Sequence, residues 1–291
     1  MRAVVFGASG TIGRALVPEL SRRYEVVAVS RNPPAAEEGV LWASADVTDA
    51  ASISDVLREG DIVVYLVHSL GTADFEQVDR LAADNLAAAA ARAGAAQIVY
   101  LGGLGPSRGE GSRHLRSRAE TAERLAAGPV PLTTLRAAMV VGPGSAAFET
   151  IRALVDRLPA MICPRWVSTP TQPISLGDVV CYLTGVCGLK AAYGKSFDIG
   201  GPEVMTYREM IERIARIRGK RLPIIVVPIL TPRLSSWWLH LVTPVNAAVA
   251  RPLIDGLRTP TTAHDTQIRE LIPIEPTSFD DAVREALGRT Q

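Results

Sequence analysis

A glycine-rich loop, GASGTIG at residues 7–13, follows an apolar run at Arg2–Phe6 and has the spacing of a phosphate-binding turn. In such a turn Gly7 permits the tight bend, Gly10 lets the backbone approach a pyrophosphate, and Gly13 lets the following helix pack close to the sheet. The N–H groups at the start of that helix bind the phosphates, whose negative charge the helix dipole favours. The loop therefore predicts a dinucleotide site rather than a glycine turn with a structural role only. The residues predicted to contact the dinucleotide here are Gly7, Ser9, Gly10, Thr11, Ile12 and Gly13.

The end of the second apolar run bears on which dinucleotide binds. An acidic residue at this position binds the ribose 2′-hydroxyl of NAD. The run EVVAVS at residues 25–30 instead ends in Ser30, and Arg31 follows it. The guanidinium of Arg31 matches a 2′-phosphate, and the hydroxyl of Ser30 adds a donor. These two residues favour NADP(H) over NAD(H), the alternative being that Arg31 merely covers the surface.

Apolar runs and helix-forming runs alternate through the first half of the chain. This alternation implies right-handed crossovers between parallel strands. We therefore predict an α/β fold with a Rossmann-type, doubly wound parallel sheet. The Ala-rich run at residues 75–93 is the clearest helix, with Gly94 at its C-terminal cap. Strands are predicted at residues 2–6, 25–30, 40–47, 61–67, 97–103 and 131–141, and helices at residues 12–22, 51–58, 75–93 and 113–126.

The pattern is looser in the second half. Thr206 and Glu209 form a capping-box pair at the start of a predicted helix, and Ser278 is a good cap for a final one. Beyond Arg218 the proline-punctuated chain is predicted to be irregular up to that final helix. The other predicted elements are helices at residues 148–158, from about residue 178 to 187, 206–218 and 279–287, and a strand at residues 196–201.

Composition excludes several classes of protein. The 291 residues are 47% hydrophobic and 21% charged, with a formal net charge of +1. This profile predicts a globular protein with a substantial core, and it argues against a disordered chain. It also argues against a strongly basic nucleic-acid binder or a polybasic membrane-surface protein. We expect neither nucleic acid nor membrane as a partner, and composition does not specify an oligomeric state.

Cysteine and histidine usage predicts no metal site. The cysteines, Cys163, Cys181 and Cys187, form no CxxC pair and lie among apolar residues, so we expect buried free thiols. The four histidines are scattered and form no ligand motif. The chain starts directly with a strand and a glycine loop, which leaves no room for a signal peptide. The expected location is the cytoplasm.

Six segments resemble the short-chain dehydrogenase/reductase superfamily, in its atypical, NmrA-like branch with an extended-type C-terminal half. The resemblance runs to about Arg218. The segments are GASGTIG, ADVTD (45–49), LVH (66–68), VYLGGLGP (99–106), LRAAMVVGPG (135–144) and FDIGGPEVMT (197–206).

This resemblance implies further contacts and a domain division. Asp46 and Val47 would contact the adenine, and residues after the fourth and sixth strands would border the nicotinamide end. Residues 1–143 would be the NADP-binding domain, to which residues 174–200 return. Residues 144–291 would be a smaller substrate-binding subdomain that forms a lid. The residues at the nicotinamide end would be Leu66, Val67, His68, Ala138, Met139 and Val140.

The catalytic positions depart from the family pattern. Standard members use a Ser after the fifth strand and a YxxxK pair, in which Tyr supplies a proton and Lys holds the ribose. Here the fifth strand ends in glycine at Gly103, and the matching pair is His114 and Arg118. Their i,i+4 spacing places both on one helix face. His114 could donate a proton, position ligands or be structural, whereas the permanently charged Arg118 cannot act as an acid.

The missing acid narrows the substrates that a reductase could use. A ketone beside its own phenol, a quinone or a conjugated enone can absorb the developing charge without a protein acid. We therefore predict an NADPH-dependent reductase of a large, apolar, aromatic ketone, and some atypical family members reduce polycyclic polyketides in this way. A redox-sensing regulator that binds NADP(H) without chemistry is the alternative, and Arg31 argues against an NAD-holding epimerase or dehydratase. The residues predicted to contact the substrate are Gly103, Trp166, Trp237 and Trp238.

Overall fold

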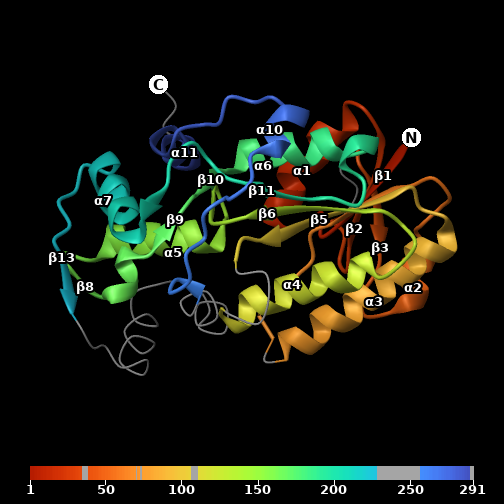
Figure 1. The fold of residues 1–291 in the computed structure, drawn as a ribbon, viewed down its shortest axis with the longest axis horizontal. Helices are drawn as coiled ribbons and strands as arrows, with labels where there is room; N and C mark the ends of the chain where they lie inside the picture. The colour runs from red at the N-terminus through yellow and green to blue at the C-terminus, as the bar shows by residue number, and fades with distance from the viewer. Residues whose placement is uncertain (35–38, 70, 73, 106–110, 228–255, 289–291) are drawn as a thin grey trace.

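A seven-stranded parallel sheet forms the centre of the computed structural model (Figure 1). The structure describes residues 1–34, 39–69, 71–72, 74–105, 111–227 and 256–288. The strands lie in the order β11-β6-β5-β4-β1-β2-β3, which confirms the predicted doubly wound α/β fold. Their bounds are β1 (Arg2–Phe6), β2 (Glu25–Ser30), β3 (Leu41–Ser44), β4 (Ile62–Tyr65), β5 (Gln97–Gly103), β6 (Leu132–Ala137) and β11 (Ser196–Ile199).

The strand order reverses at β1, where ligands bind in folds of this kind. Phe6, the last residue of β1, pairs with Val29 of β2 on one side and with Tyr65 of β4 on the other. The chain builds β2 and β3 on one side of β1 and β4, β5 and β6 on the other, so a crevice opens at the carboxyl ends of these strands. This crevice is where the glycine loop lies.

Helices cover both faces of the sheet, as Figure 1 shows. Strands buried on both sides account for the apolar runs, since side chains from each face enter a separate core cluster. On one face lie α1 (Thr11–Ser21), α6 (Leu176–Val186) and α10 (Gln267–Leu271), and on the other α2 (Ala50–Ser54), α3 (Phe75–Ala93) and α4 (Arg113–Ala126).

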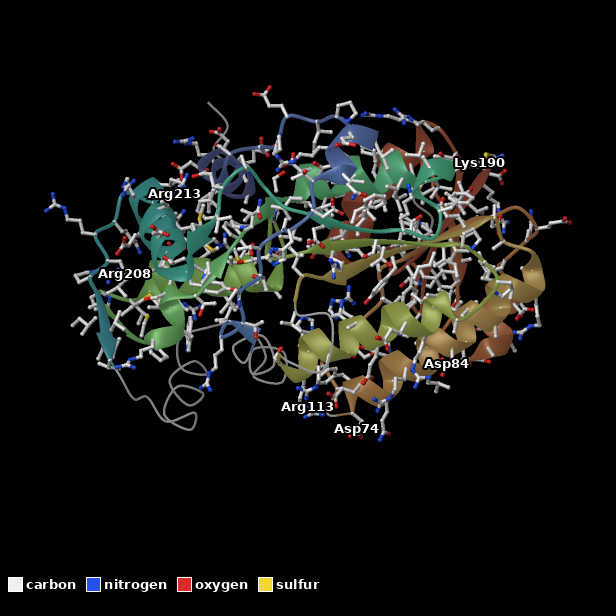
Figure 2. All side chains as sticks on the ribbon, viewed as in Figure 1. Asp74, Asp84, Arg113, Lys190, Arg208 and Arg213 are labelled. Carbon is white, nitrogen blue, oxygen red and sulfur yellow. The ribbon has the colours of Figure 1, made fainter. Side chains whose placement is uncertain are left out.

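Ion pairs on the outer side join α3 to α4, the helix that carries His114 and Arg118 (Figure 2). Exposed pairs of this kind each contribute at most about 1 kcal/mol, so they align the two helices more than they stabilise the fold. The pairs are Arg80–Glu120, Arg113–Glu76 and Arg124–Asp84, at 2.9, 2.8 and 2.6 Å.

A third core cluster joins the smaller elements at the other end of the molecule. It includes Phe148, Met210 and Phe279, from three helices far apart in the sequence. The remaining elements are β7 (Val140–Val141), α5 (Ala146–Arg157), β8 (Met161–Pro164), η1 (Arg165–Ser168), β9 (Pro170–Thr171), β10 (Ile174–Ser175), η2 (Lys190–Ala192), β12 (Met205–Thr206), α7 (Tyr207–Ile217), β13 (Ile224–Val227) and α11 (Phe279–Ala286).

Helix predictions with a clear end signal are confirmed. Helices α3 and α4 have the predicted bounds, and Gly94 caps α3 at a φ of 71°. The Thr206–Glu209 capping box is present at α7, and the side chain of Ser278 caps α11.

Other expectations were wrong. The segment after Arg218 is not wholly irregular, because β13 pairs with β8 and α10 precedes α11. The strand predicted at residues 40–47 ends at Ser44, since the chain turns at Asp46. Cys181 is exposed on α6, although Cys163 and Cys187 are buried as expected. In the part of the chain that the structure describes, no helix is both long and apolar enough to cross a membrane.

Candidate active site

The glycine loop is as tight as its sequence predicts. Gly7 has a φ of +86°, which favours glycine. A Cβ on Gly13 would lie 2.4 Å from the carbonyl oxygen of Gly7 and 2.6 Å from the Cα of Ala8, so α1 packs directly on the loop. No side chain caps α1 at Gly10, which leaves N–H groups of its first turn for a ligand. Side chains at these glycines would fill the cradle, so the bare backbone leaves room for a pyrophosphate.

The residues expected at the adenosine end gather at the carboxyl ends of β1, β2 and β3, outside the main cavity. The hydroxyl oxygens of Ser9 and Ser30 lie 3.1 Å apart, and Arg31 is exposed beside them. Asp46 accepts hydrogen bonds from the backbone and hydroxyl of Thr48, which lower the pKa of its carboxyl, and the charge of Arg31 lowers it further. Val47 is buried in the adjoining core cluster.

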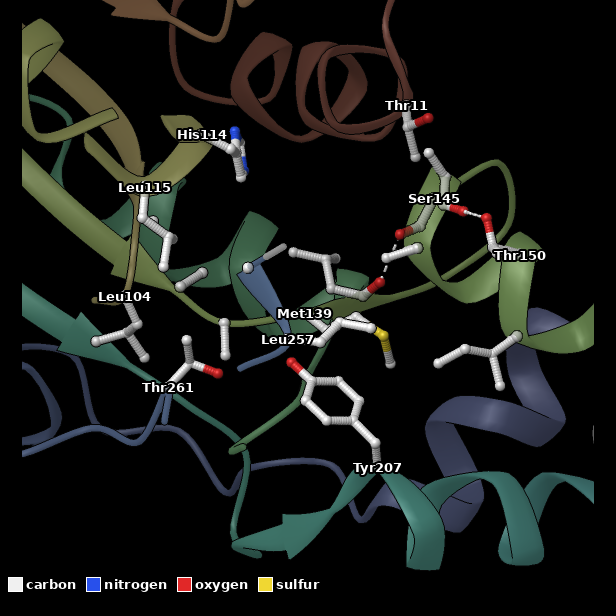
Figure 3. A pocket seen from close by; sticks show the side chains of 18 of the residues that line it. Thr11, Leu104, His114, Leu115, Met139, Ser145, Thr150, Tyr207, Leu257 and Thr261 are labelled. Carbon is white, nitrogen blue, oxygen red and sulfur yellow. Dashed lines mark hydrogen bonds between the residues drawn. The ribbon is translucent and has the colours of Figure 1, made fainter. Parts of the chain in front are cut away.

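A cavity of about 1060 Å³ opens from the glycine loop towards the third core cluster (Figure 3). The cavity brings together residues predicted from six separate segments. Ser9, Ser30, Arg31, Asp46, Val47 and Val67 do not line it, and Trp237 and Trp238 lie outside the described residues. The predicted residues that do line it are Gly7, Gly10, Thr11, Ile12, Gly13, Leu66, His68, Gly103, His114, Arg118, Ala138, Met139, Val140 and Trp166.

His68 and His114 are both neutral imidazoles in this cavity. Burial lowers the pKa of His114 to about 3, and the charges of Arg118 and His68 contribute. Burial also lowers the pKa of His68 to about 4, with Arg118 as the second cause. The His68 side chain has an exposed surface, but it lines the cavity, so the surrounding protein still limits its hydration. At neutral pH neither is a standing acid, and each can accept or donate one hydrogen bond.

Arg118 is fixed at the same end of the cavity. It donates a hydrogen bond to the carbonyl oxygen of Leu101, and its guanidinium carbon lies 5.0 Å from the centre of the Tyr100 ring. Tyr100 is fully buried, and its hydroxyl donates to the carbonyl oxygen of Arg118. The guanidinium is therefore held over an aromatic face at the end of β5.

The opposite side of the cavity carries hydroxyl groups that the sequence did not reveal. Figure 3 shows Tyr207 across the cavity from His114. Its hydroxyl is hydrogen-bonded to Thr171 and Thr261, whose own hydroxyl oxygens lie 2.8 Å apart. Burial raises the pKa of Tyr207, so its hydroxyl stays protonated. Nothing in the local sequence marks Tyr207, because this position depends on how α7 packs beneath the cavity.

Known proteins resemble this chain in sequence and in fold. Residues 7–130 match the sequence profile of a family described as NAD(P)H-binding. The matched residues belong to an NAD(P)H-binding domain. The observed glycine cradle fits the phosphates of such a cofactor.

Two curated relatives match beyond that domain. An Arabidopsis thaliana protein, NADH dehydrogenase [ubiquinone] 1 alpha subcomplex subunit 9, mitochondrial, is 27% identical over 72% of this chain, which spans 56% of that relative. The (4-alkanoyl-5-oxo-2,5-dihydrofuran-3-yl)methyl phosphate reductase of Streptomyces griseus is 26% identical over 75% of this chain and 74% of its own length. A further group of Mycobacterium relatives, 32% identical, matches over only 12% of its own length.

Solved structures share the fold over nearly the whole chain. The triphenylmethane reductase of Citrobacter sp., complexed with NADP(H), has a TM-score of 0.78 at 17% identity and covers 98% of this chain and 99% of its own. The NADPH-dependent quinone oxidoreductase of Escherichia coli, complexed with NADPH, has a TM-score of 0.77 at 19% identity and covers 99% of this chain and 100% of its own.

The buried carboxylate of Asp79 connects two segments of the NAD(P)H-binding domain that border the cavity. Asp79 of α3 accepts a hydrogen bond from the backbone N–H of Ser69 at 2.9 Å and another from the hydroxyl of Ser117 at 3.0 Å. It therefore ties the loop that carries His68 to the helix that carries Arg118. The sequence offered no signal for this contact, since Asp79 lies inside an Ala-rich helix.

Proposed function

We propose that this protein is an NADPH-dependent oxidoreductase, a ketoreductase of a large, apolar, aromatic ketone that takes its proton from the substrate. The observation that carries the proposal is the cavity itself. It starts at the glycine loop and continues between mostly apolar walls in a volume suited to a large ligand. We further propose that the chain is an atypical, NmrA-like short-chain dehydrogenase/reductase, and that its substrate is a polycyclic polyketide in antibiotic biosynthesis, as for the angucyclinone ketoreductase of simocyclinone biosynthesis.

The residues at the end of the cavity where Arg118 and His114 lie support this chemistry. The bound cofactor supplies a hydride, and the carbonyl oxygen that gains the electron pair needs a proton or a hydrogen-bond donor. Arg118 can stabilise that oxygen but cannot protonate it, and the neutral His114 is a poor acid. A hydroxyl of the substrate beside the carbonyl would supply the proton. The protein would then orient the substrate and exclude water.

Two of the similar proteins agree with this class. The Streptomyces griseus relative is a (4-alkanoyl-5-oxo-2,5-dihydrofuran-3-yl)methyl phosphate reductase, and the Escherichia coli structure is an NADPH-dependent quinone oxidoreductase complexed with NADPH. Reduction is the reaction type that they share with the proposal, and the second of them uses NADPH.

The direct test follows NADPH absorbance with a panel of polycyclic aromatic ketones. Each ketone is used with and without a hydroxyl group next to the carbonyl. We expect NADPH consumption that depends on that hydroxyl. Consumption that is equal for both members of each pair would contradict proton supply by the substrate.

His114→Phe is expected to keep activity within about tenfold of the unchanged protein, because the neutral imidazole does not supply the proton. A general acid contributes about 10²- to 10⁴-fold, so its removal would be plain in initial rates of NADPH oxidation. NADPH affinity of the variant, measured by fluorescence, serves as the control. A fall of more than about 100-fold with unchanged cofactor binding would assign the acid role to His114.

Arg31→Ala is expected to weaken NADPH binding by about 10- to 100-fold and to leave NADH binding nearly unchanged. A hydrogen bond to a charged group is worth about 1.5–3 kcal/mol, and only NADPH carries the 2′-phosphate. Calorimetric titration with both dinucleotides measures the difference. Arg22→Ala, an exposed arginine that pairs with Glu19, is the matched control. Equal effects on NADPH and NADH would remove the 2′-phosphate contact.

A second function, redox sensing without catalysis, is favoured by one observation. The end of β5 carries Gly102 and Gly103 where standard reductases of this fold place a Ser, and His114 stands where they place a Tyr. A sensor would bind NADPH, consume none across the whole panel, and change its binding to a partner between NADPH and NADP⁺. That combined result would replace the ketoreductase proposal.

A further inference from the structure

We propose that Arg118 binds the substrate through a second acidic hydroxyl in its ionised form, a phenol or enol of the aromatic compound that is distinct from the hydroxyl beside the ketone. This inference rests on the proposed function and names the class of substrate that the cavity takes. The partner of Arg118 is then a negatively charged oxygen of the substrate, which a neutral ketone alone does not have.

The first argument is the balance of charge on the cavity wall. Among the described residues that line the cavity, Arg118 is the one permanently charged side chain, and none is Asp or Glu. A half-buried cation without a counter-ion is costly, because burial strips water from it. An anion that enters the cavity would restore this balance.

The second argument is the contrast with other partly buried arginines of this protein. Arg2, Arg136 and Arg213 each form an ion pair with a carboxylate at 2.5 to 2.8 Å. Arg118 forms no such pair within 4 Å with any residue that the structure describes. Its described contacts are a neutral carbonyl oxygen and an aromatic ring.

The surrounding titratable groups leave this charge uncompensated. His68 after β4 and His114 from α4 are neutral. Burial raises the pKa of Tyr100, which lies under the guanidinium, and of Tyr65, whose ring packs against that of Tyr100.

Asp79 is the nearby carboxylate to consider. It is buried outside the cavity, and its two oxygens accept hydrogen bonds from Ser69 and Ser117. The anion therefore has to come from a ligand.

The rest of the wall specifies what carries the anion. Leu104, Leu115 and Leu257 line the same cavity as Arg118, so a small, strongly hydrated anion would lose its water there and gain only apolar surroundings, in which its charge is poorly stabilised. A phenolate or enolate spreads its charge over an aromatic frame that these side chains can contact. The two neutral imidazoles can each donate one hydrogen bond to its oxygens.

The experiment uses alizarin, a hydroxyanthraquinone whose colour changes when its phenol ionises. Protein saturated with NADP⁺, which cannot donate a hydride, is mixed with the dye and titrated with base while the absorption spectrum is recorded. We expect bound alizarin to ionise at least one pH unit below free alizarin, which means that the anion binds at least about tenfold tighter than the neutral dye. Unsubstituted anthraquinone controls for apolar binding.

Three variants test whether the guanidinium of Arg118 causes the shift in the pKa of bound alizarin. Arg118→Met is expected to abolish the shift, Arg118→Lys to keep most of it, and Arg116→Met to leave it unchanged. Arg116 is the matched control because it lies half-buried on the same helix and does not line the cavity.

Two results would overturn the proposal, namely no shift with the unchanged protein or a shift that survives Arg118→Met. A shift that survives while NADP⁺ affinity falls would assign Arg118 to the cofactor ribose instead. Since no NADPH is oxidised in this titration, a positive shift without turnover on the ketone panel would remove the ketoreductase proposal and leave the anion site standing.

Discussion

Gly13→Ala is expected to abolish tight NADPH binding. The new methyl group would lie 2.4 Å from the carbonyl oxygen of Gly7 and 2.6 Å from the Cα of Ala8. Both neighbours are backbone atoms, so they cannot move aside as the end of a side chain could. Helix α1 must shift away from the loop, and the N–H groups of its first turn leave the positions that bind the phosphates. Overpacking of this kind costs about 1–3 kcal/mol, which corresponds to an affinity loss of about 5- to 150-fold if it falls on the cofactor site.

NADPH fluorescence titration and thermal unfolding, measured on the same samples, check this expectation. Gly128→Ala is the matched control, because its Cβ would meet Ala87 at 3.8 Å, an ordinary contact. We expect the control to bind NADPH normally. A Gly13→Ala variant that is folded and binds NADPH as tightly as the unchanged protein would show that the loop does not hold the pyrophosphate.

The sequence predictions succeeded where the physical signal for a structure lies in residues that are close together in the sequence. Helix α3 has Ala-rich composition and a left-handed Gly94 at its end, so its bounds could be predicted to the residue. The glycine loop and the i,i+4 pair of His114 and Arg118 are also local patterns, and the structure places the loop and both side chains on one cavity.

The predictions failed where structure depends on distant partners. Strand β13 pairs with β8, which lies more than 60 residues earlier, and its Ile225 and Val226 are exposed, so no alternation marked it as a strand. The hydroxyl cluster of Tyr207, Thr171 and Thr261 likewise forms only when β9 and the C-terminal segment meet. Burial is the larger cause of the low pKa of His114, ahead of the charge of Arg118, and burial cannot be inferred from the spacing of residues in the sequence.

Asp61→Ala is expected to lower the free energy of unfolding by about 3–5 kcal/mol, a large part of the roughly 5–15 kcal/mol that stabilises a typical domain. Asp61 is almost fully buried just before β4, where it accepts two hydrogen bonds from Arg2 at 2.9 and 2.8 Å and one from the backbone of Arg58 at 2.7 Å. The variant leaves Arg2 as a buried cation without its partner. It also removes the hydrogen bond from Arg58 that fixes the chain just before β4, the strand that leads to His68.

Urea unfolding measures this loss, and a double variant identifies its cause. Arg2→Met combined with Asp61→Leu removes both charges and fills their space with apolar side chains, a replacement that is often neutral or stabilising for buried pairs. We expect it to recover most of the lost free energy of unfolding. If Asp61→Ala costs less than about 1 kcal/mol, the ion pair is hydrated in solution. If the double variant is as unstable as the single one, the hydrogen bond to Arg58, rather than the unpaired charge of Arg2, stabilises this end of the sheet.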